Sequence, residues 1–489
     1  MKRVAISLLG AAALAFAAQP DVTKEFSKNL PLAAGQRLEI EHSMGPVSVR
    51  AAAQKEVSVR ASIEVSASSK DEAQKYADQI EIRVESTGSG VSVRTTYPDR
   101  NGFRLSGRNT SFSVRLDITM PEGAGLLLRN SFGAVNVTGL RGEGDIRNSH
   151  GRLEFRDGRG TQRIENAFGE TQVLGNQGDV TVSNGNGALT VMDITGSANV
   201  NDRFGKVVVN RIGKGATVVN ANGAVEVTDT GGVTSVTNSF GSVTAARVKG
   251  DLSVRNQNGS VEARGVTGAA DLTTSFSAVN FSDIGGKVTV TANNGKIMGT
   301  KAGGQVEARN SFGGVELDGV KGARVVSGNS SITLRDVEGE AYAKTSFGAL
   351  RIERASGPVT AENSNGAIQV SGAKGAVTAR TSFGGITIDG YGGALDITGG
   401  NGSVSISGAS GTACMPVTVR TSFGAVRVAL PASSNYDLNA RTSFGRIQSD
   451  FPITASGTLG GDEINGKIGS GGCPLRINNT NGAIEILKR

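Results

Sequence analysis

Few side chains in this sequence have the type and spacing of metal ligands. The sequence contains two histidines, His42 and His150, and each lies in a turn of a repeated pattern described below. A metal site needs several ligands that converge, and neither histidine has a cysteine or another histidine near it in the sequence. The repeats also lack the aspartates of calcium-binding solenoids. We therefore interpret both histidines as replacements for a turn asparagine, and we expect no metal and no other cofactor.

Pairs of carboxylates could hydrolyse a glycosidic bond, and some enzymes that cleave polysaccharides are long β-helices. Such enzymes hold two carboxylates about 5 to 9.5 Å apart. Candidate pairs are Glu316 with Asp318, and Glu338 with Glu340. Outward positions of a strand are polar by default, so we interpret both pairs as parts of a solvated face. No G-x-S-x-G elbow accompanies a triad, and no P-loop occurs. We expect no catalytic residues, with a carbohydrate-active enzyme as the alternative.

A recurring basic residue is the surface feature that could bind a ligand. It stands directly before the Asn or Thr that leads a turn, and the set is Arg129, Arg147, Arg255, Arg309, Lys344, Arg380, Arg420 and Arg441. In a stack of repeats these side chains would form a broken stripe that attracts anionic envelope polymers, lipopolysaccharide or DNA in a salt-dependent way. Alternatively, their stems cover apolar edges at strand ends. We expect no nucleic acid partner, because aromatic residues are not expected between these cations on the surface.

The two cysteines are Cys414 and Cys473, and each is followed closely by a proline and a predicted strand. In an exported protein such a pair is a candidate disulfide. An 18-residue coil, introduced below, argues against the bridge, because bridged Cα atoms lie within about 7 Å of each other. The pairing therefore stays open at the level of sequence.

Most of the side chains considered above lie in a region where glycine recurs every nine residues. A glycine occurs at every ninth residue from Gly133 to Gly205, and the period resumes at Gly223 and continues to Gly268. Each glycine precedes the pattern x-apolar-x-apolar-x, which predicts a short strand with one buried face. The residues between strands are rich in Asn, Ser, Thr, Asp and Gly, which are typical turn residues.

Longer periods are superimposed on the nine-residue period. Turns led by Asn or Thr alternate with turns that carry a lone aliphatic residue, which gives a repeat of 18 residues. A unit this short cannot bury its own apolar face and must stack on its neighbours. We therefore predict an all-β fold, a parallel β-solenoid (single-stranded β-helix) of nine-residue half-repeats with about 18 residues per coil. A 36-residue coil is the alternative, although it would leave a void that Val and Ala cannot fill.

The third residue of the Asn- or Thr-led turns alternates with a period of 36 residues. The phenylalanines are Phe132, Phe168, Phe204, Phe240, Phe276 and Phe312, and the interleaved residues are His150, Asn186, Asn222, Asn258 and Asn294. An exposed ladder of phenylalanines could bind a ligand, but such a residue is more often buried at the corner of a coil. We therefore predict that the phenylalanines belong to the core. The asparagines are expected to bond the backbone of neighbouring turns or to adopt left-handed φ.

Both ends of the repeat region depart from the pattern. Residues 21–125 carry longer alternating strands and, near 69–80, a capping box followed by apolar residues at helical spacing. Residues 126–412 are the regular repeats, and residues 413–489 contain insertions and a Gly-rich loop. An uncovered terminal strand would pair with other chains. We therefore predict capping units at both ends, the first with one short inserted helix.

The N-terminus reads as a signal for export. Lys2 and Arg3 precede a short apolar run that ends in Ala15-Phe16-Ala17, so we predict a signal peptide at residues 1–17. Removal of its two cations lowers the formal net charge from +7 to +5. No later stretch is apolar enough to span a membrane.

Several segments resemble one family. The signal peptide, the opening segment 38–49, the Thr421-Ser-Phe-Gly424 turn with Leu430-Pro431, and the closing segment 479–486 are similar to the exported bacterial family known as putative adhesins of unknown function. The β-helical domain of that family also occurs in cell-envelope stress-response proteins. The resemblance implies a β-solenoid fold and an exported protein, and it supplies no catalytic residues.

The sequence therefore predicts a non-enzymatic exported β-solenoid that serves as an adhesin-like or envelope-associated binding scaffold. Its location would be the periplasm, the cell surface or the medium, and its partner an envelope polysaccharide or another cell-surface component. The alternatives are a carbohydrate-active enzyme on a β-helix and an envelope-stress regulatory or peptide-binding module.

Overall fold

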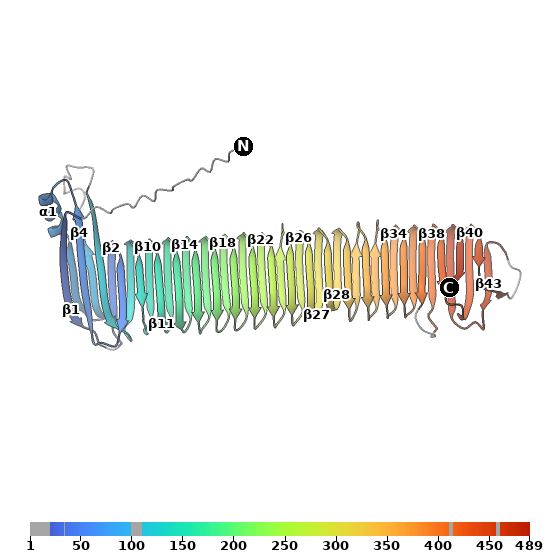
Figure 1. The fold of residues 1–489 in the computed structure, drawn as a ribbon, viewed down its shortest axis with the longest axis horizontal. Helices are drawn as coiled ribbons and strands as arrows, with labels where there is room; N and C mark the ends of the chain where they lie inside the picture. The colour runs from blue at the N-terminus through green and yellow to red at the C-terminus, as the bar shows by residue number, and fades with distance from the viewer. Residues whose placement is uncertain (1–19, 34, 99–109, 410–413, 456–459) are drawn as a thin grey trace, which may run out of the picture. The chain divides into compact units, whose positions relative to one another are not determined.

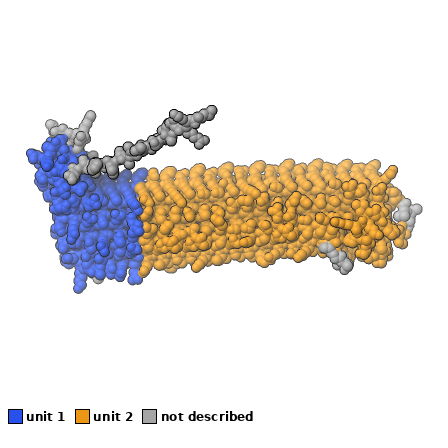
Figure 2. Space-filling view, viewed as in Figure 1, with its two compact units in different colours: residues 1–160, 165–168 blue, residues 161–164, 169–489 orange. Residues whose placement is uncertain are grey.

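The computed structural model describes residues 20–33, 35–98, 110–409, 414–455 and 460–489. The signal peptide predicted at residues 1–17 lies outside them. The described part of the chain contains 45 strands and one helix. The chain divides into two compact units, coloured separately in Figure 2: unit 1 comprises residues 1–160 and 165–168, and unit 2 comprises residues 161–164 and 169–489.

Most of unit 2 is a stack of parallel strands in which a strand pairs with the second strand after it (Figure 1). β14 (Val180–Asn186) pairs with β16 (Ala198–Phe204), and β15 (Leu189–Ile194) pairs with β17 (Val207–Ile212). Paired residues are 18 positions apart, as in Val180 opposite Ala198. This register confirms the predicted parallel β-solenoid with about 18 residues per coil and excludes the 36-residue coil.

The two strands of each coil bury an apolar core between them. Val180, Val182, Leu189 and Val191 are at most 1% exposed, because alternate residues of a strand point to opposite faces. Burial of a side chain of this size contributes roughly 1.5–3 kcal/mol. Equivalent positions are buried along the stack and are mostly aliphatic, with exceptions such as Phe281, so the core is a continuous column within the unit.

Asparagines stack at one corner of the coils. Asn220, Asn238 and Asn256 occupy the third inward position of their strands and are at most 3% exposed. The Nδ2 group of each donates to the carbonyl oxygen of the turn glycine one coil earlier, at 3.3, 3.2 and 2.8 Å respectively. This asparagine ladder satisfies carbonyls that would otherwise be buried without a partner. It also fills the corner, which decides where the following side chain can go.

The glycine of that turn lies against the neighbouring coil. Gly223 has a φ of +145°, and a Cβ atom there would lie 1.8 Å from the carbonyl oxygen of Gly205. At Gly241 and Gly313 the corresponding distances to the preceding coil are 2.3 and 2.5 Å, again with positive φ. At these three positions only glycine tolerates both the conformation and the contact. The glycine period of these turns therefore follows from how closely stacked turns approach each other.

Unit 1 combines similar coils with antiparallel strands. β2 (Arg37–Met44) pairs in parallel with β8 (Gly125–Phe132). β4 (Glu56–Ser66) pairs antiparallel with both β1 (Val22–Pro31) and β7 (Ser111–Pro121).

The helix α1 (Lys70–Gln79) lies in unit 1, where the capping box predicts one. The Ser69 hydroxyl oxygen accepts a hydrogen bond from the backbone N–H of Glu72 at 3.3 Å, and it thereby satisfies a free donor of the first turn. The helix buries Ala73, Tyr76 and Ala77.

The last coil of the chain is not the last coil of the stack. β44 (Pro474–Asn481) lies between β38 (Val417–Phe423) and β40 (Tyr436–Phe444) and pairs in parallel with both. β45 (Ile484–Lys488) lies in the same way between β39 (Val426–Leu430) and β41 (Ile447–Ser449). The C-terminal segment is thus inserted between two coils that precede it in the sequence.

A disulfide joins Cys414 to Cys473, with their Cα atoms 5.3 Å apart. The two cysteines stand just before β38 and β44, which are direct neighbours. The objection that an 18-residue coil separates them is therefore wrong, because the order of coils in space does not follow the order of the chain here.

Candidate functional site

One edge of unit 2 presents phenylalanines to solvent. Most of them lie at strand ends directly before the turn glycine, as at the end of β16, β20 (Thr234–Phe240) and β34 (Val377–Phe383), and all are 48–73% exposed. Asparagines hold the same position in the coils between them. We call this set the aromatic edge: Phe204, Phe240, Phe276, Phe312, Phe347, Phe383, Phe423 and Phe444, with Asn222, Asn258, Asn294, Asn329, Asn365, Asn401 and Asn481.

The prediction that these phenylalanines belong to the core is wrong. The inward corner position is held by the asparagine ladder, as by Asn238, two residues before Phe240. The chain then turns at the glycine, so the phenylalanine finds no inward space and projects from the corner. The expectation of a surface without repeated aromatic residues fails for the same reason.

Phenylalanine and asparagine alternate from coil to coil along the aromatic edge. The register places Asn222 opposite Phe204 on one side and opposite Phe240 on the other. Since neighbouring strands lie about 4.8 Å apart, successive rings repeat at about 9.6 Å. The alternation holds even at the inserted C-terminal coil, where Asn481 lies opposite both Phe423 and Phe444.

In unit 1 the same turn position carries a continuous stack of rings. His150 lies between Phe132 and Phe168, with ring centroids 4.6 and 4.9 Å apart and planes tilted by 13° and 11°. His150 therefore stands where unit 2 has asparagine. A planar ring fits between two phenylalanines that are two coils apart.

His42 is the counterpart of a ladder asparagine, because the register places it opposite Asn130. It is 3% exposed, its Nε2 lies 2.9 Å from the carbonyl oxygen of Val114, and its Nδ1 lies 3.1 Å from the hydroxyl of Thr95. Burial lowers the pKa of His42 from 6.5 to about 4. Within the described residues no group of three or more His, Cys, Asp or Glu side chains is placed to hold a metal ion.

Most of the basic residues of the predicted stripe are paired with carboxylates. Arg129 contacts Glu41, Arg147 contacts Asp145, and Lys344 contacts Glu362. Arg380 and Arg420 share Asp396, at 3.5 and 3.0 Å. Among the described residues, Arg255, Arg309 and Arg441 make no ion pair within 4.0 Å. Among these eight basic residues, the strand register places Arg129 directly opposite Arg147. An anion-binding stripe therefore stays a prediction.

The acidic pairs considered for glycoside hydrolysis have basic partners. Glu316 lies 3.0 Å from Lys296, and Glu338 pairs with Lys321. One carboxylate of each pair is thereby held in an ion pair on the surface.

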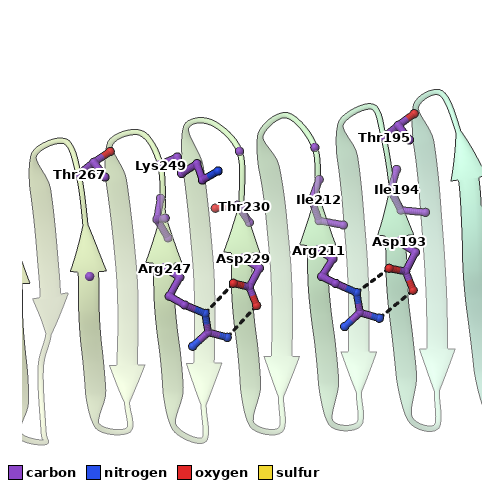
Figure 3. A pocket seen from close by; sticks show the side chains of 14 residues that line it. Asp193, Ile194, Thr195, Arg211, Ile212, Asp229, Thr230, Arg247, Lys249 and Thr267 are labelled. Carbon is purple, nitrogen blue, oxygen red and sulfur yellow. Dashed lines mark hydrogen bonds and ion pairs between the residues drawn. The ribbon is translucent and has the colours of Figure 1, made fainter.

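The opposite edge of unit 2 carries a groove of about 750 Å³ that contains two ion pairs between coils (Figure 3). Arg211 donates from Nε and Nη2 to the carboxylate of Asp193 at 2.5 and 2.7 Å, and Arg247 donates in the same way to Asp229 at 2.6 and 2.7 Å. The guanidinium group of Arg211 lowers the pKa of Asp193. These four charges neutralise one another in pairs, and Lys249 also lines the groove.

All four of these side chains start from left-handed backbone, with φ between 54° and 59°. Gly265 holds the equivalent position one coil after Arg247, also with positive φ. The sequence carries the signal for this groove, because Asp193, Arg211, Asp229 and Arg247 follow each other at intervals of 18 residues. That pattern was missed because the charges lie in the turns with the lone aliphatic residue.

No protein-family profile and no curated protein sequence matches this chain. Three solved structures are similar in part. A putative cell adhesion protein from Clostridium sporogenes has 8% identity and a TM-score of 0.16, with 96% of this chain and all of that chain covered. A putative adhesin from Bacteroides fragilis has 12% identity and a TM-score of 0.18, and the match covers 58% of this chain and 97% of that chain. A putative adhesin from Parabacteroides distasonis has 11% identity and a TM-score of 0.20, and the match covers 60% of this chain and 97% of that chain. Likenesses at these TM-scores do not bear on the function of this chain.

Across the described residues, no helix has both the length and the apolar character that a membrane crossing requires.

Proposed function

We propose that this protein is a non-enzymatic, exported, adhesin-like scaffold, and that the aromatic edge of unit 2 is its binding surface. The observation that supports the proposal is the alternation of exposed phenylalanine with asparagine, one ring on every second coil. The disulfide between Cys414 and Cys473 agrees with an oxidising compartment outside the cytoplasm.

The alternate coils provide an internal comparison for the aromatic edge. Asn222 and Asn258 hold the same turn position as Phe240, in register with it. The turn therefore does not need an aromatic side chain, and a polar residue would keep the surface more soluble. A large apolar side chain that is about half exposed and repeated along one edge is typical of an interaction surface.

The spacing of the rings favours an extended partner with a repeating structure. Each ring offers a small contact, and many such contacts along one edge act together once the first is made. The partner would be a component of the envelope or of a cell surface. In each carboxylate pair considered for catalysis, one member is held in an ion pair with a lysine.

The test replaces phenylalanines of the aromatic edge by the residue that neighbouring coils carry. In the variant Phe240→Asn/Phe312→Asn/Phe383→Asn we expect binding to isolated cell envelopes or whole cells to fall at least about tenfold, because three contacts along the edge are lost. The thermal midpoint should stay within a few degrees of the wild type, since asparagine fits this turn.

The control is Val233→Asn, which removes an exposed aliphatic side chain, 64% accessible, from the opposite turn. It should bind like the wild type. Unchanged binding by the triple phenylalanine variant would refute the proposed function.

A further inference from the structure

We propose that the partner of the aromatic edge is the aromatic edge of a second copy of this chain, with the phenylalanines of each copy inserted over the asparagines of the other. The inference rests on the proposed function, because it takes the aromatic edge as the binding surface and names what binds there.

The first reason is that unit 1 shows the space between two rings to be filled by a third. Phe132 and Phe168 hold His150 between them at 4.6 and 4.9 Å. In unit 2 the equivalent positions carry asparagine, which is shorter than phenylalanine. Phe204 and Phe240 are 48% and 52% exposed, and the register places the shorter Asn222 between them. We infer that the space over Asn222 is a slot that can take a ring, as the equivalent space in unit 1 takes His150.

The second reason is the match of periods. A ring from another molecule can enter every slot only if its own rings repeat at about 9.6 Å, which is two coils. A second copy has the same ring spacing, so no mismatch accumulates along the edge. An extended β-strand repeats at about 6.8 Å and does not fit. A polyproline helix repeats at about 9.3 Å per turn, and it would drift out of step by about 2 Å over seven slots.

The alternation is kept where the chain order would break it. Phe423 and Phe444 belong to coils that follow each other in the sequence, and without a coil between them their rings would lie side by side with no slot. The inserted β44 places Asn481 between them. Elsewhere the spacing in sequence changes, from Phe312 to Phe347 and from Phe383 to Phe423, yet an asparagine still lies between each pair.

The third reason is the area available. A phenylalanine side chain buries about 200 Å² when it is fully covered, so a ring that is half exposed has about 100 Å² left to bury. Eight rings per copy therefore give about 800 Å² per partner, which is the area of a standard stable interface. The phenylalanine and asparagine positions of the aromatic edge themselves carry no charge.

The decisive variant fills the slots while it keeps every phenylalanine. Asn222→His/Asn258→His/Asn294→His copies the arrangement of His150 in unit 1. If the rings interdigitate, the histidines occupy the slots, and the dimer dissociation constant, measured by sedimentation of the mature chain, should rise at least about 100-fold. If the edge were merely apolar and adhesive, these added rings would leave association unchanged or strengthen it.

The companion variants are Phe240→Asn/Phe312→Asn/Phe383→Asn, which should also dissociate the dimer, and Val233→Asn, which should not. A wild type that stays monomeric at the highest soluble concentration, or a histidine variant that dimerises as tightly as the wild type, overturns the inference. If the monomeric wild type still binds envelopes through its phenylalanines, the proposed function stands and the self-association alone falls. Binding of a proline-rich peptide that the histidine variant loses would assign the slots to that ligand instead.

Discussion

At the scale of single residues, His42 shows how one position of the asparagine ladder can titrate. It lies opposite Asn130, and its ring is buried against the carbonyl oxygen of Val114 and the hydroxyl of Thr95. The neutral ring accepts a hydrogen bond at Nδ1 and donates one from Nε2. A second proton would have to be carried without water around it, and burial accordingly lowers its pKa to about 4.

The substitution His42→Asn tests this at the residue scale. Above pH 6.5 the side chain is neutral in both states, so the folded and unfolded proteins do not differ in protonation. As the pH falls from about 6.5 to about 4, the unfolded chain gains a proton that the folded chain does not take up. The wild type should therefore lose up to about 3 kcal/mol of unfolding free energy over this range.

Urea unfolding at a series of pH values provides the measurement. The carboxylates contribute to both proteins, so the difference between the wild-type and His42→Asn curves isolates the histidine. Parallel curves between pH 4 and pH 6.5 would show that His42 takes up its proton equally in the folded and unfolded states.

At the scale of elements, the turn that forms the aromatic edge depends on the contact between stacked glycines. The Gly223 position combines a φ of +145° with a Cβ site 1.8 Å from the preceding coil. We expect Gly223→Ala to lower the unfolding free energy by about 3 kcal/mol, because both the backbone conformation and the coil spacing must change.

The matched control is Gly314→Ala, one residue after an equivalent turn glycine, where the nearest atom to a Cβ would be 3.6 Å away and φ is not positive. This change should leave stability within about 0.5 kcal/mol of the wild type or raise it. Equal thermal midpoints for the two alanine variants would contradict the explanation of the glycine period.

At the scale of the whole molecule, the chain closes its C-terminal end by insertion. β44 and β45 add a coil between two earlier ones, and the disulfide ties the start of β44 to the start of β38. The inserted coil keeps both of its neighbours covered, and it keeps phenylalanine and asparagine in alternation.

Removal of the disulfide tests how far this insertion depends on the covalent link. The bridge closes a loop across a sequence separation of 59 residues, so we expect Cys414→Ser/Cys473→Ser to lower stability by about 2–4 kcal/mol. Amide exchange should rise first in residues 474–488, because the inserted coil loses its attachment to β38. Faster exchange spread evenly over unit 2 would argue against a locally held insertion.

The sequence by itself determined the coil of this protein. The glycine period, the alternation in Val180 and Val182, and the turn residues are local features, and a parallel stack with a dry interior is the arrangement that satisfies all of them. The helix followed from its capping box for the same reason, since Ser69 and Glu72 act on neighbouring backbone groups.

Only the tertiary structure decided which side chains fill the corner and which leave it. Asn238 and Phe240 both precede the turn, and the buried hydrogen bond from Asn238 to the neighbouring coil takes the space that Phe240 was predicted to fill. The same holds for Cys414 and Cys473 and for the charges of the stripe. Each depends on which residue of another coil lies alongside, and that is fixed by register and by the inserted C-terminal coil rather than by neighbours in the sequence.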